Sequence, residues 1–401
     1  MRKILLLLSI LLSVFITTKA NNNNPIILLD SSTQVSILTC NPGNEVYSTF
    51  GHSAIWIMDS VNHINKVYNY GTFAFEDNFI YKFVKGDLNY YLSIDNINGF
   101  VNDYIYEQRG ITQQVLNLNI QEKQKLFVFL SNNYKPENRT YRYDFLFDNC
   151  STRILDAIDS ATDHKIKYDY TFITHESSYR QLIASKAGYM KWLTFGMDLM
   201  LGIPCDKKAS NKDHLFLPDN LMTAYFFASI NRGGTEERLV AHTYTLLDIP
   251  IVQHATPFYI SPIFIFSIFA FILAFITYYE YKKNKWFRAI DIVLYIILVL
   301  IGFLFIFMWT STRHMVAHIN LGLFFANPLL IITIAFIVLK KYPFIKQAAL
   351  IYASILLMLL LSWHWIFPQK FNWALFPFIL VLFIRAYYMF YYSKKKINGT
   401  T

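Results

Sequence analysis

The residues best suited to chemistry centre on one cysteine. Cys150 lies in the run DNCSTR (residues 148–153), where a strand-like stretch gives way to a helical pattern. A cysteine in the first turn of a helix lies near unpaired N–H groups and the positive end of the helix dipole. Both lower the pKa of the thiol and favour the nucleophilic thiolate. The position therefore predicts a nucleophile, although on spacing alone a packing role for the thiol stays open.

A thiolate mechanism also needs a base, and His52 is the candidate among the ten histidines. It follows Gly51 and opens an alternating stretch that predicts a strand, which would hold the imidazole on a rigid support. The base of such a pair is oriented by a third group. Asn69, on the next predicted strand, can bond to the far ring nitrogen. We therefore predict a catalytic set of Cys150, His52 and Asn69.

Three further polar residues are candidates for substrate binding. Arg153, one turn along from Cys150, would supply charge to an oxyanion, and a surface ion pair is equally compatible with its position. His314 and Asn320 belong to a polar loop between two apolar stretches, a depth at which polar groups face a cavity or a lipid headgroup. The spacing of His314 and His318 would suit a metal on a helix, but no third ligand is evident. We predict no metal and no cofactor.

The elements that must position these residues form one mixed domain over residues 21–256. β-rich runs are found at residues 35–39, 53–58, 66–70, 89–94 and 112–118. Helical patterns are found at residues 97–107, 120–133, 150–160, 177–186 and 215–230. Strands that come first and helices that come later predict an α+β domain rather than a doubly wound sheet.

Residues 1–20 have the layout of a cleaved secretory signal. Two cations precede an apolar run, and Thr18 and Ala20 put small residues at the cleavage positions. An uncleaved anchor is the alternative. In either case residues 21–256 are predicted to be exported.

The last third of the chain, residues 257–401, predicts a membrane domain. Five apolar stretches, each close to the ~20 residues that cross a bilayer, lie at residues 258–280, 289–309, 321–339, 348–366 and 373–392. If residues 21–256 are outside, the loops inside carry Lys282, Lys283, Lys285, Arg288, Lys340, Lys341, Lys346, Lys394, Lys395 and Lys396. The loops outside carry only Arg313 and Lys370. This asymmetry predicts an inner-membrane protein with a periplasmic domain and a cytoplasmic C-terminus.

The charge balance excludes other classes of protein. The net charge of +9 comes from the membrane segment, because residues 257–401 have 13 basic and 2 acidic side chains. Residues 21–256 have 20 basic and 25 acidic side chains, which argues against a nucleic-acid partner. A composition of 54% hydrophobic and 16% charged residues excludes a single soluble domain.

The three cysteines raise the question of a disulfide in an oxidising compartment. If any two pair, we expect Cys40 and Cys205, because Cys150 must stay free to attack.

Several of these runs resemble the family of the Lnb N-terminal periplasmic domain. They lie at residues 38–43, 47–54, 68–73, 141–145 and 148–153, and the five apolar stretches also fit that family. The order of a strand-borne His, a polar residue and then Asn-Cys is similar to the circularly permuted branch of the papain-like NlpC/P60 superfamily, which includes the lecithin–retinol acyltransferases. The resemblance implies an α+β papain-like periplasmic domain followed by an all-α domain of five transmembrane helices.

The same resemblance implies a lipoprotein N-acyltransferase with Cys150 as nucleophile and His52 as general base. The acyl donor would be a membrane phospholipid, and the acceptor would be the N-terminal amine of a diacylglyceryl lipoprotein. The runner-up is a membrane-tethered periplasmic cysteine hydrolase, a peptidase or amidase acting on peptidoglycan or envelope peptides. A third possibility is a non-catalytic receptor or assembly factor. The number of apolar stretches favours a lipid substrate, because a tether needs only one span.

Overall fold

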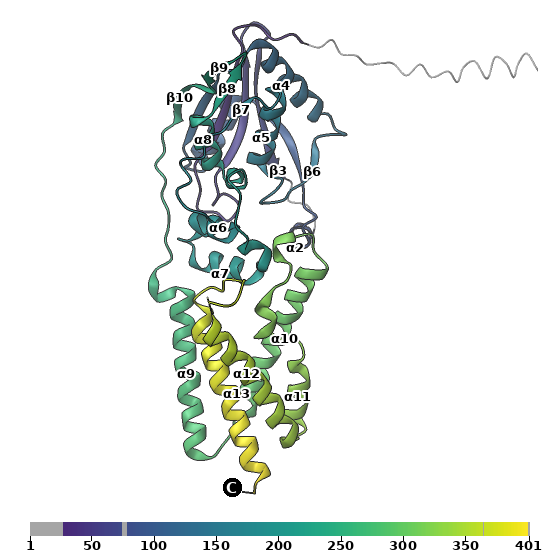
Figure 1. The fold of residues 1–401 in the computed structure, drawn as a ribbon, viewed down its shortest axis with the longest axis vertical. Coiled ribbons are helices and arrows are strands. Elements are labelled where there is room, and N and C mark those ends of the chain that lie inside the picture. Colours follow the sequence, from purple (N-terminus) through teal and green to yellow (C-terminus); the bar gives the residue numbers. More distant parts are fainter. Residues whose placement is uncertain (1–26, 74–77, 364, 400–401) are drawn as a thin grey trace, which may run out of the picture.

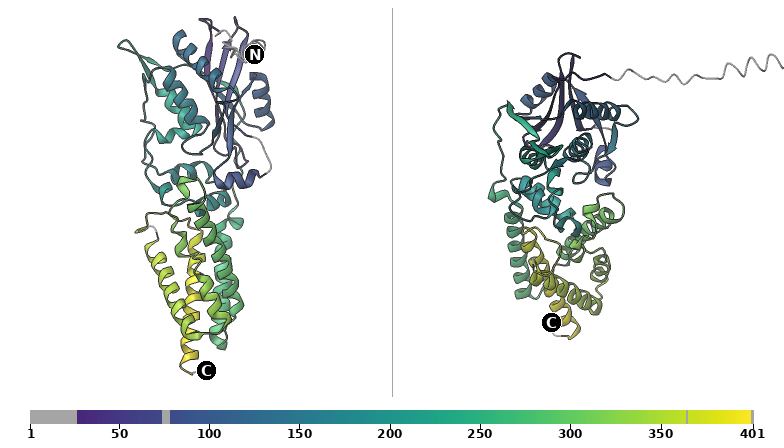
Figure 2. Two further views of the ribbon diagram at one scale, coloured as in Figure 1. Left: turned by 90° about the vertical axis from the view of Figure 1, so that its right-hand side faces the viewer. Right: turned by 45° about the horizontal axis from the view of Figure 1, so that its top comes forward.

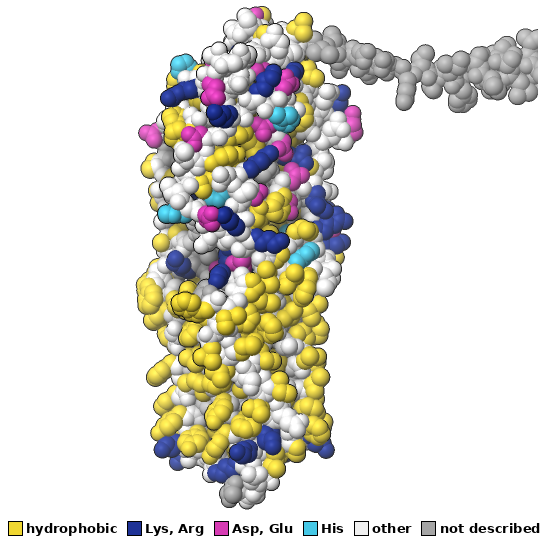
Figure 3. All heavy atoms as spheres, viewed as in Figure 1, with side chains coloured by type: hydrophobic (Ala, Val, Ile, Leu, Met, Phe, Trp, Pro, Cys, Tyr) yellow, Lys and Arg dark blue, Asp and Glu magenta, His cyan; other side chains and the backbone are white. Residues whose placement is uncertain are grey.

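A computed structural model describes residues 27–73, 78–363 and 365–399. The signal predicted at residues 1–20 lies outside the described residues. A β-sheet domain is stacked on a bundle of helices, and the C-terminus lies at the end of the bundle remote from the sheet (Figures 1 and 2). Figure 3 shows hydrophobic side chains covering the helical half, with Lys and Arg gathered at its far end.

The sheet has seven strands in the order β10-β5-β1-β2-β3-β4-β6, and every neighbouring pair is antiparallel. The strands are β1 (Gln34–Cys40), β2 (His52–Asp59), β3 (Ile64–Thr72), β4 (Asn89–Asp95), β5 (Ile111–Leu116), β6 (Thr140–Arg142) and β10 (Val240–Leu247). A second sheet consists of β7 (Ile166–Lys167), β8 (Ser229–Arg232) and β9 (Thr235–Arg238).

The N-terminal half has helices on both faces of the large sheet and at its junction with the bundle (Figure 1). They are α2 (Phe79–Lys85), α3 (Ile97–Tyr106), α4 (Ile120–Asn133), α5 (Cys150–Ala161), α6 (Tyr179–Ala187), α7 (Lys191–Met200) and α8 (Pro218–Phe227), with 3₁₀ turns η1 (Ile203–Asp206) and η2 (Asp213–Phe216). On one face, α5 buries Ile154 against Ile55 of β2. On the other face, α3 buries Phe100 against Ala54 and Val67. The strands are buried on both faces because their apolar residues occupy successive positions.

The five predicted strands correspond to β1–β5, and the predicted helices correspond to α3, α4, α5, α6 and α8. Strand β10 was not predicted from the sequence. This strand follows α8 in the chain and pairs with β5 at the edge of the sheet. The N-terminal half is therefore a sheet-rich domain, and its last strand comes from just before the membrane helices.

The helical half has four helices long and apolar enough to cross a membrane among the described residues: α9 (Pro262–Lys283), α10 (Arg288–Thr310), α12 (Tyr342–Ser362) and α13 (Leu375–Ile397). The count of five long helices predicted for this half is not confirmed, because residues 321–339 do not form one continuous helix. That segment consists of a 3₁₀ turn, η5 (Leu321–Phe324), and the nine-residue helix α11 (Leu330–Val338). Pro328 lies between them, and its missing N–H and rigid ring prevent one helix from running through.

The irregular backbone before α11 is covered by protein. A Cβ at Gly302 of α10 would overlap Ala326 and Pro328, so this stretch packs directly on the α10 backbone. Tyr352 of α12 donates its hydroxyl hydrogen to Phe325 O at 2.7 Å. Non-helical backbone at membrane depth is tolerated when it is shielded in this way.

The helices of the bundle pack in the order α9-α13-α12-α11-α10. A buried cluster of charges joins three of them near the end remote from the sheet. Arg385 of α13 contacts Glu280 of α9 and bonds Asp291 of α10 at 2.7 and 3.0 Å, and all three side chains are at most 1% exposed. Buried charges of this kind persist when they are paired and hydrogen-bonded.

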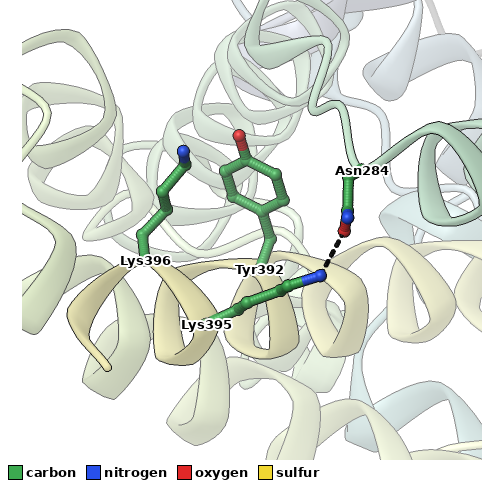
Figure 4. A pocket seen from close by; sticks show the side chains of 4 residues that line it. All are labelled: Asn284, Tyr392, Lys395 and Lys396. Carbon is green, nitrogen blue, oxygen red and sulfur yellow. Dashed lines mark hydrogen bonds between the residues drawn. The ribbon is translucent and has the colours of Figure 1, made fainter. Parts of the chain in front are cut away.

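A small cavity of about 90 Å³ lies at the same end of the bundle (Figure 4). Lys395 and Lys396 line it from α13, together with Tyr392 and Asn284, and Lys395 donates to Asn284 Oδ1 at 2.6 Å. These lysines belong to the cationic end of the bundle visible in Figure 3.

Among the described residues, main-chain hydrogen bonds dock the sheet domain on the bundle at two places. At the first, Gly202 N–H donates to Val316 O at 2.8 Å and Ile203 N–H donates to Ile319 O at 3.2 Å. A side chain at Gly202 would overlap His318 O, so only glycine permits this approach. At the second, α2 contacts the loop after α10, where Arg313 N–H donates to Lys85 O at 2.9 Å.

The cationic end predicts the topology of the chain. We expect the C-terminus to lie in the cytoplasm and residues 27–256 to lie in the periplasm, because Lys and Arg flanks are retained inside. A reporter that is active only in the cytoplasm, fused after Thr401, should be active. A periplasm-specific reporter active at that position would contradict the orientation.

Candidate active site

Cys150 is the first residue of α5, and the residues around it determine where that helix begins. Asn149 caps the helix: its Oδ1 accepts from Ser151 N–H at 2.9 Å and from Thr152 N–H at 3.0 Å. Thr152 Oγ1 accepts from Asn149 N–H at 2.8 Å, which completes a capping box. Because the capping box starts the helix at one residue, it holds Cys150 in the first turn.

His52 is the first residue of β2, and the neighbouring strand leaves room for its ring. Gly71 of β3 lies beside it with φ of +99°. A Cβ at Gly71 would lie 3.3 Å from His52 Cε1 and 3.8 Å from Cys150 Cβ. The glycine therefore keeps open the space in which the imidazole and the cysteine meet.

The structure brings Cys150, His52 and Asn69 together. His52 Nε2 lies 2.7 Å from Asn69 Oδ1, an acceptor, so Nε2 carries the proton. The other ring nitrogen, Nδ1, is left for Cys150, and the thiol and the imidazole are hydrogen-bonded. This is the geometry of a nucleophile, a base and an orienting group.

The charges of the pair favour a thiolate and an imidazolium. Burial raises the pKa of the Cys150 thiol, but the charge of His52 and its hydrogen bond, with further bonds from Ser53 N–H and Ser151, lower it more, so the net shift is downward. Burial lowers the pKa of His52, but the Cys150 thiolate and the bonds to Cys150 and Asn69 raise it more. Each charge thus stabilises the other in a poorly solvated site.

The other two cysteines differ from Cys150. Burial raises the pKa of Cys40 and of Cys205 to about 12 in each case. Both are free and lie in separate apolar clusters, one with Leu38 and one with Leu182. The expected pairing of Cys40 with Cys205 is therefore wrong, since separate burial keeps the thiols apart.

Arg153 is engaged in an ion pair. Its Nε and Nη2 donate to the two carboxylate oxygens of Asp148 at 2.6 and 2.8 Å. Its guanidinium lies 3.7 Å from the centre of the Tyr141 ring. Of the two readings that the sequence allowed, the structure contains the ion pair. A direct role at an oxyanion stays a prediction that no contact of Arg153 supports.

His314 and Asn320 belong to the docking contacts. His314 Nε2 bonds Phe83 O of α2 at 2.9 Å. Asn320 is 3% exposed, and its Nδ2 donates to Leu199 O of α7 at 2.9 Å. Their contacts are with the docking elements rather than with Cys150 or His52, so substrate binding by either remains a prediction.

The spacing of His314 and His318 does not produce a metal site in this structure. The two residues flank a 3₁₀ turn, η4 (Met315–Ala317), instead of sharing a helix face. In the part of the chain that the structure describes, no group of three His, Cys, Asp or Glu side chains could hold a metal ion.

Sequence reasoning missed the tyrosines around the nucleophile. Tyr90 stacks on Tyr143 with ring centres 4.2 Å apart, and Tyr141 lies next to Tyr90 across the β4–β6 pair. Burial, and then the charge of the Cys150 thiolate, raise the pKa of Tyr143. The alternating Tyr-Arg-Tyr at residues 141–143, just before the cysteine motif, was the available signal.

The site lies at the ends of the central strands β2 and β3, on the side of the sheet domain that faces the membrane domain. β2 begins there with His52, and β3 ends there just beyond Gly71. The chain then forms α2 before it returns as β4, and α2 lies at the junction with the bundle (Figure 1). The β1–β2 connection on this side also reaches the docking elements, because Tyr189 donates its hydroxyl hydrogen to Gly43 O at 3.1 Å.

Comparison with known families assigns both halves of the chain. The family model of the Lnb N-terminal periplasmic domain matches residues 28–184. That of the Lnb transmembrane domain matches residues 253–397. The chain belongs to the Lnb family. No curated protein and no solved structure matches it.

The two Lnb matches divide the candidate residues between them. The periplasmic-domain match includes Cys150, His52, Asn69 and Arg153, and the transmembrane-domain match includes both His314 and Asn320. Membership of this family means that the chain is a membrane protein with a periplasmic N-terminal domain. It also means that the chain is an acyltransferase-type enzyme.

The lowered pKa of Cys150 predicts selective alkylation of this Lnb-family protein. Iodoacetamide should modify Cys150 faster than Cys40 or Cys205, and the rate should fall as the pH falls through the lowered pKa, because the thiolate is then protonated. In His52→Ala the positive charge is lost while burial remains, so the profile should move to higher pH. An unchanged pH profile in His52→Ala would contradict the pairing.

Proposed function

We propose that this Lnb-family chain is a thiol-dependent lipoprotein N-acyltransferase. It moves an acyl chain from a membrane phospholipid through a Cys150 thioester to the N-terminal amine of a diacylglyceryl lipoprotein. The observation that carries the proposal is the group Cys150, His52 and Asn69 at the strand ends that face the membrane domain. We also propose a papain-like fold for the sheet domain and a location in the bacterial inner membrane.

The first half-reaction uses the charges of the resting pair. The Cys150 thiolate attacks the ester carbonyl carbon of the phospholipid, and the carbonyl electrons move to oxygen. When the tetrahedral intermediate collapses, the carbon–oxygen ester bond breaks. His52 Nδ1–H gives its proton to the departing alkoxide, so a lysophospholipid leaves and a thioester and a neutral imidazole remain.

The second half-reaction restores the enzyme. The neutral amine of the lipoprotein attacks the thioester carbonyl, and His52 Nδ1 accepts a proton from the attacking nitrogen. The carbon–sulfur bond breaks, and the Cys150 thiolate leaves beside the imidazolium. The product is the N-acyl lipoprotein. Asn69 holds Nε2 throughout, so Nδ1 stays directed at the sulfur.

Transfer requires that water be kept from the thioester, since hydrolysis would waste the acyl chain. Cys150 is 7% exposed and lies within the apolar cluster of the sheet domain. Tyr47 of the β1–β2 connection and Tyr81 of α2, two segments that contact the docking elements, have exposed side chains. These features support a lipid substrate over a soluble peptide.

The loss of acyl-transfer activity on substitution should follow the chemical role of each residue. Cys150→Ala and Cys150→Ser should abolish transfer, because a serine hydroxyl is a far weaker nucleophile with this base. His52→Ala should lower the rate by ~10²–10⁴-fold, the usual contribution of base catalysis. Asn69→Ala should lower it less, since it removes orientation only. Mass spectrometry of lipoprotein N-termini from cells with and without each variant measures the effect.

Cys205→Ala is the matched control, since it removes a buried thiol outside the site and should leave transfer intact. Lipoproteins that keep a free N-terminus in cells expressing the wild-type protein would refute the acyl-transfer proposal. Release of cleaved peptidoglycan peptides that depends on Cys150 would favour the hydrolase.

A further inference from the structure

A second cavity, of about 200 Å³, lies on the sheet domain outside the catalytic residues. The loop between β7 and α6 forms one wall, and α6 forms another. The third wall is the segment from η2 to the first turn of α8, which contributes His214 and Asn220. Neither Cys150 nor His52 lines this cavity, so any ligand in it is held away from the reacting bond.

His214 is the residue that points to a ligand. It is only 5% exposed, and within the described residues its imidazole has no hydrogen-bond partner. Burial lowers the pKa of His214 more than the charge of Asp213 raises it, so the ring is neutral, with one donor and one acceptor. Polar groups buried to this extent normally have partners. A bound molecule with neutral donors and acceptors would supply them.

The rest of the lining carries no free charge. Lys186 is its cation, and this ammonium forms an ion pair with Asp219. Thr174 and Ser177 contribute hydroxyl groups, and Leu182 contributes an apolar surface. A phosphate headgroup would need a free cation. Peptide units suit such a lining better, because each one is neutral and carries both a donor and an acceptor.

The loop before α6 also offers its main chain. Within the described residues, the N–H and C=O groups of Thr174, His175 and Glu176 make no main-chain hydrogen bonds. All three residues are exposed, so a ligand can reach these groups. Free main-chain groups on a surface can pair with an extended peptide, as they do when a peptide is added to a sheet edge.

The wall that carries His214 also lies against the active site. Phe216 O accepts from Nδ2 of Asn149, the residue before the nucleophile, at 2.9 Å. A Cβ at Gly51, the residue before the base, would lie 3.7 Å from Pro218. The segment from η2 to α8 therefore contacts the neighbours of both catalytic side chains and lines the cavity as well.

We propose that this cavity binds the polypeptide of the acceptor, at the residues that follow its lipidated cysteine. The proposal rests on the proposed acyl transfer and gives the protein part of the second substrate a binding site. The acceptor amine must reach the thioester while the rest of its chain leaves the site. An extended chain covers ~3.3–3.6 Å per residue, so a few residues carry it past the η2–α8 segment. His214 then bonds a peptide unit of the acceptor.

Two acceptors with the same lipid test the site. One is a diacylglyceryl-cysteine amide, and the other is a lipopeptide that continues with uncharged Ser, Asn and Ala residues. Binding is measured on full-length Cys150→Ala in phospholipid nanodiscs, where no turnover occurs. Adding Ser185→Trp, at an exposed position of α6 that lines the cavity, should weaken lipopeptide binding roughly tenfold, which corresponds to the loss of one or two hydrogen bonds. Binding of the cysteine amide should not change.

His214→Leu tests the same contact without filling the cavity, because it removes the hydrogen-bonding ring, and it should also weaken only lipopeptide binding. Ser160→Trp is the matched control, since Ser160 is an exposed helical serine outside the cavity, and it should bind both acceptors normally.

The proposal is overturned if the cavity variants bind the lipopeptide normally, or if both acceptors weaken together, which would mark a general disturbance of the domain. Weaker binding of the donor phospholipid alone would overturn it in favour of a lipid headgroup. If the protein with Cys150 intact binds the lipopeptide through the cavity but never acylates it, the acyl-transfer function is refuted and the peptide site stands.

Discussion

The contact between the Cys150 thiol and the His52 imidazole sets the main requirement on this fold. Its two partners come from elements nearly a hundred residues apart, so α5 must be held firmly on β2. Ile154 and Ile158 of α5 are fully buried among the core residues of that sheet face. Ser53 Oγ and Ser151 Oγ meet at 3.3 Å directly beside the pair. Tight packing there keeps two polar groups together in surroundings where each alone would be costly to bury.

Docking of the sheet domain adds a second constraint, because the site must stay on the side of the domain that faces the membrane helices. The segment that carries Gly202 is secured by Arg180 of α6, which bonds Asp206 at 2.9 Å and Leu201 O at 2.9 Å. Gln369, in the connection before α13, donates to Leu201 O at 3.1 Å from the other side. Main-chain hydrogen bonds, supported by buried side chains on both sides, therefore fix the position of the sheet domain on the bundle.

Local signals explain which features could be predicted from the sequence. The Asn-Cys-Ser-Thr run and the alternation after His52 are local patterns, so the start of α5 and the strand β2 were predictable along with the candidate trio. The break in the helix within residues 321–339 was not predictable, because the length of the apolar stretch hides the effect of Pro328.

Other features depend on contacts that no spacing reveals. The sequence left Arg153 open between an oxyanion role and an ion pair, because its contact with Asp148 depends on how the turn before α5 folds. β10 joins the sheet from a distant part of the chain, and His314 and Asn320 became docking residues only once two domains met.

The buried charges of the bundle constrain how the protein is made. Glu280 and Asp291 lie on the first two membrane helices to be synthesised, whereas Arg385, the cation that contacts both, lies on the last. During synthesis the α9–α10 hairpin therefore enters the membrane with two carboxylates that still lack this partner. Their charges can be buried as the structure has them only after α13 has joined. Completion of the membrane domain thus waits for the final stretch of the polypeptide, and a chain cut short before α13 leaves two acids stranded in the bilayer.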